Sequence, residues 1–335
     1  MLRHVSFLPP IAADAQASPE QRALCDDPEL CKELVRDLRL DPFFMTRDAW
    51  NSNGFLLSQQ NWGNPTPRPD GYSKIQSSVS CERSAKHAIL GYATRFLIKF
   101  LSDKTYFPKS HAQSEYSWLF LAFSILWVKS SKDEPSCVLV CYDDSIKVRD
   151  EIKQAFVDYP LGNLKESPFA IYDVLLRCVV RLYDNALWLF REPVRDKEKA
   201  SANLLCWTNA DVIQRRLVGS EEVFGHSSHE TEQNMKARID RHVSLHELAR
   251  HAIHMSETIQ AATSTVQLAV RNVEIYSSSA GAHAKPINTI IGLQSSANSL
   301  ETLKLRSDSF VKRIANEIDF VRSLSTDSAN DTRVG

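Results

Sequence analysis

The last third of the chain carries two apolar stripes with the spacing of helices. From Leu245 to Val273, apolar residues alternate at steps of three and four over nine positions. From Leu300 to Val321 the apolar residues of a second stripe recur at steps of three, four and seven, and its opposite face carries charges of both signs. The polar segment 277–286, SSSAGAHAKP, interrupts the pattern between them. These features predict a helical hairpin of two long helices, the second with about 25 residues.

The larger members of both stripes are expected to form the packing surface of these helices. Monomeric proteins seldom leave that much apolar surface in water, so the helices are expected to pack on each other or on other copies. The expected packing positions are Leu245, Leu248, Met255, Ile259, Val266, Val273, Leu300, Leu303, Phe310, Ile314 and Ile318.

Short apolar runs in the middle of the chain indicate a sheet. The run CVLVCYDD (137–144) is partly β-branched and lies between Pro135 and an aspartate pair, which predicts a strand. The run 116–128 is apolar at nearly every position, so its period does not distinguish strand from helix. A helical pattern then runs from Ser145, a suitable N-cap, to a stop at Pro160. We therefore expect an α+β protein, with an α/β domain followed by long helices.

The first 75 residues have a different composition. Proline, aspartate, asparagine and glutamine are frequent there, and the segment 61–72, NWGNPTPRPDGY, is dense in turn-forming residues. We expect extended, irregular structure in this region, one short helix near 19–40, and little contribution to the core. The expected domains are an irregular N-terminal region 1–75, an α/β domain 76–230, and a long-helix region 231–335 that ends in a polar tail.

Charge and cysteine usage narrow the choice of partner and compartment. A formal net charge of -1 and a pI near 6.8 provide no basic field for nucleic acid. The seven cysteines include no CxxC pair, and the N-terminus does not read as a signal peptide. Reduced thiols and a cytoplasmic location are therefore expected. The longest apolar run has about 13 residues, too few for a transmembrane helix.

Known catalytic motifs are missing from the sequence. There is no G-x-G, no G-K-[ST] and no G-x-S-x-G, so we expect neither a nucleotide enzyme nor a serine hydrolase of the elbow type, and no enzyme in general. The only dense candidate is the histidine group in the region from His226 to His254. Within it, His242 and His246 lie four residues apart, a spacing that can hold a metal ion. A solvated polar helix face is the favoured interpretation, because the segment HELARH departs from the HExxH zinc motif.

The stretch LYDNALWLFREPVRDKEK (182–199) is the other distinctive feature. Five residues step along it by three and four and share one helix face, provided that the helix continues through Pro193. We interpret the face as a structural seam in which the arginines pair with the acidic residues and the tryptophan packs beneath them. Binding of an anion or an acidic partner is the alternative. The five residues are Asp184, Trp188, Arg191, Arg195 and Glu198.

Three stretches together carry a family resemblance. They are the apolar segments between 117 and 144, the stretch 182–199 just described, and LKLRSDSFVKRIANEIDFV (303–321). In these stretches the chain resembles the cytosolic part of CorA-like divalent-cation transporter proteins of filamentous fungi, over about residues 90 to 325. The most specific part includes Tyr183, beside the five residues of the seam.

The resemblance implies an α/β cytosolic domain followed by stalk helices that pack around one another. In transporting members the last stalk helix continues into a membrane-crossing helix, and a Gly-Met-Asn signature follows in a pore for Mg²⁺ or related ions. This sequence contains neither a Gly-Met-Asn signature nor a crossing helix, so no pore residue or metal ligand can be assigned. Mg²⁺ is implied only by the resemblance, and no cofactor is expected with certainty.

Three hypotheses about function follow. The favoured one is a soluble regulatory or relic paralogue that cannot conduct ions alone and that assembles with itself or with full-length relatives through the stalk helices. The first alternative is that the sequence is an incomplete chain of a membrane Mg²⁺ transporter, which would place the protein in a membrane. The second alternative is a metal-dependent enzyme that uses the region from His226 to His254.

Overall fold

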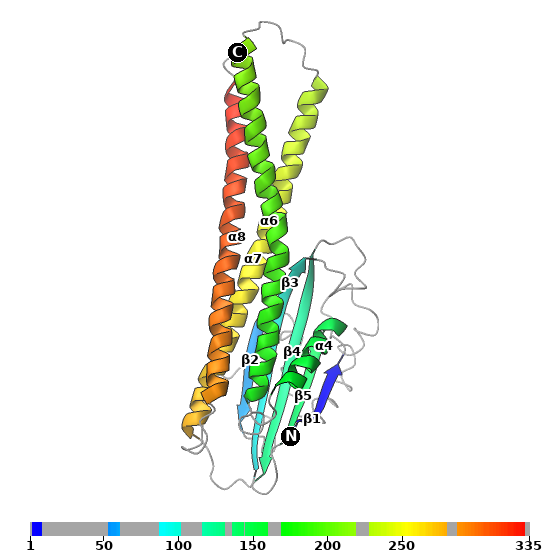
Figure 1. Cartoon of the computed structure of the whole chain (residues 1–335), viewed down its shortest axis with the longest axis vertical. Coiled ribbons are helices and arrows are strands. Elements are labelled where there is room, and N and C mark those ends of the chain that lie inside the picture. The colour runs from blue at the N-terminus through cyan, green and yellow to red at the C-terminus, as the bar shows by residue number, and fades with distance from the viewer. Residues whose placement is uncertain are drawn as a thin grey trace, which may run out of the picture. The chain divides into compact units, whose positions relative to one another are not determined.

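Five strands and four long or medium helices make up the described part of the chain (Figure 1). The computed structural model describes residues 2–8, 53–60, 87–101, 116–130, 136–143, 145–159, 169–218, 228–279 and 287–331. The strands are β1 (Leu2–Leu8), β2 (Gly54–Gln60), β3 (His87–Leu101), β4 (Tyr116–Ser130) and β5 (Ser136–Asp143). The helices are α4 (Ile146–Asp158), α6 (Ala170–Val218), α7 (Ser228–Ser279) and α8 (Ile287–Asp331). The protein is therefore of the α+β class, as expected.

The strands form one sheet in the order β1-β5-β4-β3-β2. β1 runs parallel to β5, and every other neighbouring pair is antiparallel. β3 and β4 pair along their whole length, from His87 opposite Ser130 to Leu101 opposite Tyr116. This long antiparallel pair forms the centre of the sheet, and the two strands nearest the N-terminus take its two edges.

Two regular strands lie within residues 1–75, which differs in part from the prediction for this region. Irregular structure was predicted there, yet 2–8 and 54–60 are regular strands of the main sheet. Their pairing partners lie far along the chain, on β5 for the first and on β3 for the second, so the local pattern could not reveal them. The helix expected near 19–40 lies outside the described residues.

The run 116–128, which the sequence left open between strand and helix, belongs to strand β4. Adjacent residues of a strand face opposite sides of a sheet. Leu121 and Ala122 are both at most 1% exposed, so β4 is covered on both faces. β3 is buried in the same way along residues 91–100. Burial on both faces explains why the run is apolar throughout rather than alternating.

Two cations are buried in strand β3. Arg95 is 1% exposed and its guanidinium carbon lies 5.2 Å from the ring centroid of Phe120. Lys99 is 6% exposed and its Nζ lies 4.3 Å from the ring centroid of Trp118. A ring face attracts a cation, so aromatic side chains of the neighbouring strand compensate part of the cost of desolvation.

The first helix after the sheet begins and ends where the sequence predicts. Ser145 is the N-cap residue of α4, although its side chain makes no capping hydrogen bond, and Tyr159 is the C-cap before Pro160. α6 continues without interruption through Pro193. An internal proline removes one backbone hydrogen bond and costs about 3 kcal/mol, so the packing of the neighbouring turns must outweigh that loss.

The chain divides into two compact units. Unit 1 comprises Met1–Asp184 and Glu257–Thr302, and unit 2 comprises Asn185–Ser256 and Leu303–Gly335. Unit 1 holds the sheet, α4 and one portion each of α6, α7 and α8. Unit 2 holds the remaining portions of those three helices. The domain limits expected at residues 75 and 230 stay a prediction.

The eleven packing positions expected on the two long helices are all buried, at 0% to 8% exposure. The stripes are therefore covered within one chain, where α6 joins the two helices in each unit. α8 is also longer than expected, with 45 residues. It begins earlier because Leu293 and Ala297, both buried, continue the stripe toward its N-terminus. Among the described residues, no helix combines the length and the apolar character that crossing a bilayer requires.

Candidate functional site

Tyr183 joins three elements of unit 1. Its side chain is 2% exposed, and its hydroxyl donates a hydrogen bond to the carbonyl oxygen of Leu97 on β3 at 2.9 Å. The carbonyl oxygen of Thr258 on α7 lies 3.3 Å from the same hydroxyl. Burial raises the pKa of Tyr183 well above its ordinary value, so the phenol stays protonated as a donor. This residue of the family-like stretch therefore has a structural role.

Trp188 lies under the guanidinium of Arg191, but it is exposed at the surface, and its second cation is Arg306 of α8. Its side chain is 50% exposed on unit 2, and the guanidinium carbons of Arg191 and Arg306 each lie 5.2 Å from its ring centroid. The nearby side chains of Leu187 and Phe190 are the ones that are buried, at 0% and 1% exposure. The tryptophan consequently forms a surface patch with two cations.

Glu198 also departs from the expected seam, because its partner lies on another helix. Both carboxylate oxygens accept hydrogen bonds from Arg313 of α8, from Nε at 2.6 Å and from Nη2. The hydrogen bond from Arg313 is the main cause that lowers the pKa of Glu198, and the same bond raises the pKa of Arg313. The seam thus connects α6 to α8 and is not closed within α6, where Arg191 and Arg195 are exposed.

A polar layer next to this ion pair connects all three helices of unit 2. Nη2 of Arg241 on α7 donates to the hydroxyl of Ser201 on α6, and that hydroxyl donates to the carboxylate of Glu317 on α8. Nη1 of Arg241 also donates to the carbonyl oxygen of Ala200 at 3.3 Å. Burial lowers the pKa of Arg241. The sequence contains no motif that would have identified this layer.

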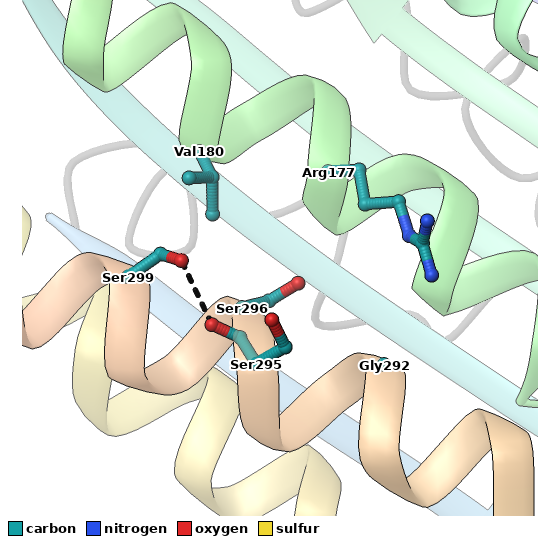
Figure 2. Close-up of a pocket in the computed structure, with 6 residues that line it drawn as sticks. All are labelled: Arg177, Val180, Gly292, Ser295, Ser296 and Ser299. Atoms are coloured by element: carbon teal, nitrogen blue, oxygen red, sulfur yellow. Dashed lines mark hydrogen bonds between the residues drawn. The ribbon is translucent and has the colours of Figure 1, made fainter.

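A shallow pocket of about 230 Å³ lies between α6 and α8 in unit 1 (Figure 2). Arg177 and Val180 on α6 lie opposite three serines and a glycine on α8. Its volume is below the roughly 300 Å³ at which small-molecule sites usually begin. None of its lining residues is a carboxylate, a histidine or a thiol that could act as a general base beside a serine. The lining residues are Arg177, Val180, Gly292, Ser295, Ser296 and Ser299.

Arg177 is held beside this pocket by a buried carboxylate. Asp173 is 1% exposed and accepts hydrogen bonds from Arg177 Nε at 3.0 Å and Nη2 at 2.9 Å, and from the Tyr159 hydroxyl at 3.2 Å. The bond to Asp173 is the main cause that raises the pKa of Arg177. On α8, a Cβ added to Gly292 would lie 2.3 Å from Asp173 Oδ1. Only glycine leaves room for the carboxylate there, so Gly292 allows α8 to pack closely on α6.

The histidine group separates into different environments. His226 lies outside the described residues, and His251 and His254 are half-buried on α7. His242 and His246 form a close pair, with their Nε2 atoms 3.0 Å apart and their ring centroids 4.5 Å apart. In the described part of the chain, no group of three or more histidine, cysteine, aspartate or glutamate side chains could hold a metal ion.

A second apolar stripe, which we name the outer stripe, lies on the face of α7 opposite its buried stripe. Three aliphatic side chains of unit 2 are largely exposed there: Ile239 at 56%, Val243 at 55% and Ile253 at 44%. His246 and Arg250 continue the same face, so the spacing along it is four, three, four and three. The sequence carried this signal, but the stronger stripe from Leu245 to Val273 concealed it.

Comparison with solved structures finds several that are similar to this chain. No family model matches the sequence, and no curated protein matches it. The cytoplasmic domain of ZntB from Vibrio parahaemolyticus is similar in structure, with a TM-score of 0.44 and 8% sequence identity over 90% of this chain and 86% of that chain. At that identity and TM-score, the likeness does not indicate which residues act in this chain.

Proposed function

We propose that this chain is a non-catalytic, CorA-like assembly module that associates with other copies or with full-length CorA-like relatives through the helices of unit 2. The resemblance in 182–199 and 303–321 supports the class. Residues of these two stretches meet in the structure, where Glu198 pairs with Arg313 and Phe190 contacts Phe310 at a centroid distance of 5.7 Å. Their shared role is to hold α6 and α8 together.

The outer stripe is the observation that carries the proposal. The stripe from Leu245 to Val273 is buried inside the chain and is not available to a partner. The outer stripe instead presents Ile239, Val243 and Ile253 to solvent on one helix face. Ile239 and Ile253 each lie seven residues from His246, so two antiparallel copies related by a two-fold axis at His246 would bring isoleucines together on both sides.

In this role the chain is regulatory. It would take a place among the helices of full-length relatives through the outer stripe. Exposed isoleucine and valine side chains gain about 25 cal/mol per Å² of apolar surface that a partner covers, so a row of three can drive a weak, concentration-dependent association.

The test is the mass of the full chain in solution as its concentration is raised. Light scattering after size exclusion is expected to show self-association that the double variant Ile239→Ser, Ile253→Ser abolishes. The matched control is Leu305→Ser on α8, since Leu305 is 72% exposed in the same unit but lies off the outer stripe. The unaltered chain and Leu305→Ser should also co-purify with a full-length CorA-like relative, and the double variant should not. A monomer at every concentration that also binds no relative, or equal loss in the control, contradicts the proposal.

A further inference from the structure

We propose that His242 and His246 form a binding site for a divalent transition-metal ion of the Zn²⁺, Ni²⁺ or Cu²⁺ class on the exposed side of α7. The two residues are one helical turn apart, so the helix itself brings their rings together. Both rings turn the same nitrogen, Nε2, toward one point, and the two Nε2 atoms are 3.0 Å apart. The rings meet nearly edge to face, at an interplanar angle of 77°.

The separation of the two nitrogens fits one shared metal ion. With metal–nitrogen bonds of about 2.05 Å, nitrogens about 3.0 Å apart subtend roughly 95° at the metal. That angle is close to the right angle of square-planar or octahedral coordination, and a tetrahedral ion needs only about 0.3 Å more separation. For both Nε2 atoms to bind the ion, each ring carries its proton on Nδ1.

The donor set selects the kind of ion. Imidazole nitrogen suits Zn²⁺, Ni²⁺ and Cu²⁺, whereas Mg²⁺ and Ca²⁺ require oxygen ligands. The carboxylate of Glu247, the residue after His246, is engaged by Nη2 of Arg250. Since no third protein ligand stands beside the pair in the described residues, water fills the remaining positions. The site is therefore open, exchangeable and distinct from an Mg²⁺ site of the kind that the family resemblance implies.

Binding is coupled to the helix. The pair has this geometry only while residues 242–246 are helical, so a bound ion stabilises this part of α7 by mass action. The site lies on the same face as the outer stripe, but the inference does not depend on self-association, because both ligands come from one chain.

Calorimetric titration of the chelator-treated full chain tests the proposal. NiCl₂ or ZnCl₂ is expected to bind at one site per chain and to raise Tm, while MgCl₂ does not compete. His242→Ala and His246→Ala should each weaken binding by about tenfold or more, since one of two protein ligands is lost. Arg271→Ala, at an exposed arginine elsewhere on α7, is the control and should bind like the unaltered chain. Adding Arg250→His to His242→Ala recreates a pair four residues apart and should restore binding.

A second measurement does not require any variant. In the unaltered chain, the bound ion should protect both rings from acylation by diethyl pyrocarbonate, read by mass spectrometry as slower modification at His242 and His246. Unchanged affinity in the double variant His242→Ala, His246→Ala, absence of protection at these two rings, or no binding of any of these ions overturns the proposal. Loss of self-association alone would leave this result unaffected, so the two proposals fail separately.

Discussion

α6, α7 and α8 contribute to two units that hold their helices together by different means. In unit 1 two polar links are centred on buried groups: the Tyr183 hydroxyl, which donates to Leu97, and the Asp173 carboxylate, which accepts from Arg177 and Tyr159. In unit 2 the ion pair between α6 and α8 is about one-third exposed, with side-chain exposures of 35% for Arg313 and 31% for Glu198. A bond to a buried group cannot be replaced by a bond to water when it breaks, whereas a partly exposed ion pair can exchange its partner for water. Unit 1 should therefore respond to substitution much more strongly than unit 2.

The outer surfaces of the two units suggest why such a difference is useful. Unit 2 carries the outer stripe and the pair of His242 and His246, which are the features proposed to meet other copies and metal ions. Helices held by water-exposed pairs can adjust slightly at low cost when a partner binds. Unit 1 has close packing at Gly292 and has a sheet whose central strands are covered on both faces.

Gly292→Ala should produce the largest effect. The new Cβ would lie between 2.3 and 2.7 Å from the atoms of the Asp173 carboxyl group, which cannot move without losing its bonds to Arg177 and Tyr159. We expect a loss of about 1 to 3 kcal/mol in the free energy of unfolding, even though alanine is the better helix former. Urea unfolding followed by circular dichroism measures it.

A double-mutant cycle separates this clash from any other cause. In an Asp173→Ala background the obstacle is gone, so Gly292→Ala should then cost little or become stabilising. Ser295→Ala, an exposed change one turn away on α8, is the control and should stay within about 0.5 kcal/mol of the unaltered chain. Additive losses in the cycle would show that Gly292 and Asp173 do not oppose each other.

The sequence contained enough to predict the elements whose signal is local. The strand at 137–143 and the helix start at Ser145 follow from composition and capping, and the structure confirms them. The eleven stripe positions follow from period, and they are buried in the structure. Strands β1 and β2 were not predicted, because each has only seven residues and the surrounding sequence is rich in turn-forming residues. The alternation over so short a segment is too weak a signal to indicate a strand there. Their stability comes from partners far away in the chain.

The candidate sites show the same limit. Spacing placed Glu198 beside Arg191 and Arg195, but its partner is Arg313, which is 115 residues later. Which of several arginines an acid meets depends on how the helices are rotated, and a single helix pattern does not fix that rotation. The pair of His242 and His246 was predictable as a pair, because four residues on one helix set its geometry. That the pair is exposed beside Val243 and Ile253 came only from the structure.

Tyr183→Phe should have an intermediate effect, and Tyr172→Phe is its matched control. Both tyrosines are at most 2% exposed in unit 1, but in the described residues only Tyr183 has an accepting carbonyl, while the Tyr172 hydroxyl has no hydrogen-bond partner. Removal of the Tyr183 hydroxyl should cost about 1 kcal/mol. Removal of the Tyr172 hydroxyl should be neutral or stabilising, since an unsatisfied buried group is lost. Equal changes in urea midpoint would mean that the bond to Leu97 adds nothing.

Glu198→Gln should have the smallest effect, and it has a pH signature. The pair with Arg313 is about one-third exposed, so solvent screening limits its contribution to about 0.2 to 1 kcal/mol, less at high salt. The folded protein lowers the pKa of Glu198. This contribution is therefore fully present above the pKa of an unfolded glutamate, about 4.3, and is lost as the pH falls through the lower folded value. The stability difference between the unaltered chain and Glu198→Gln should be constant from neutral pH to about pH 5 and should shrink below about pH 4.

Glu192→Gln, an exposed change on the same helix, serves as the control. A difference that grows on acidification, or that matches the loss from Gly292→Ala in unit 1, would remove the contrast between the two units.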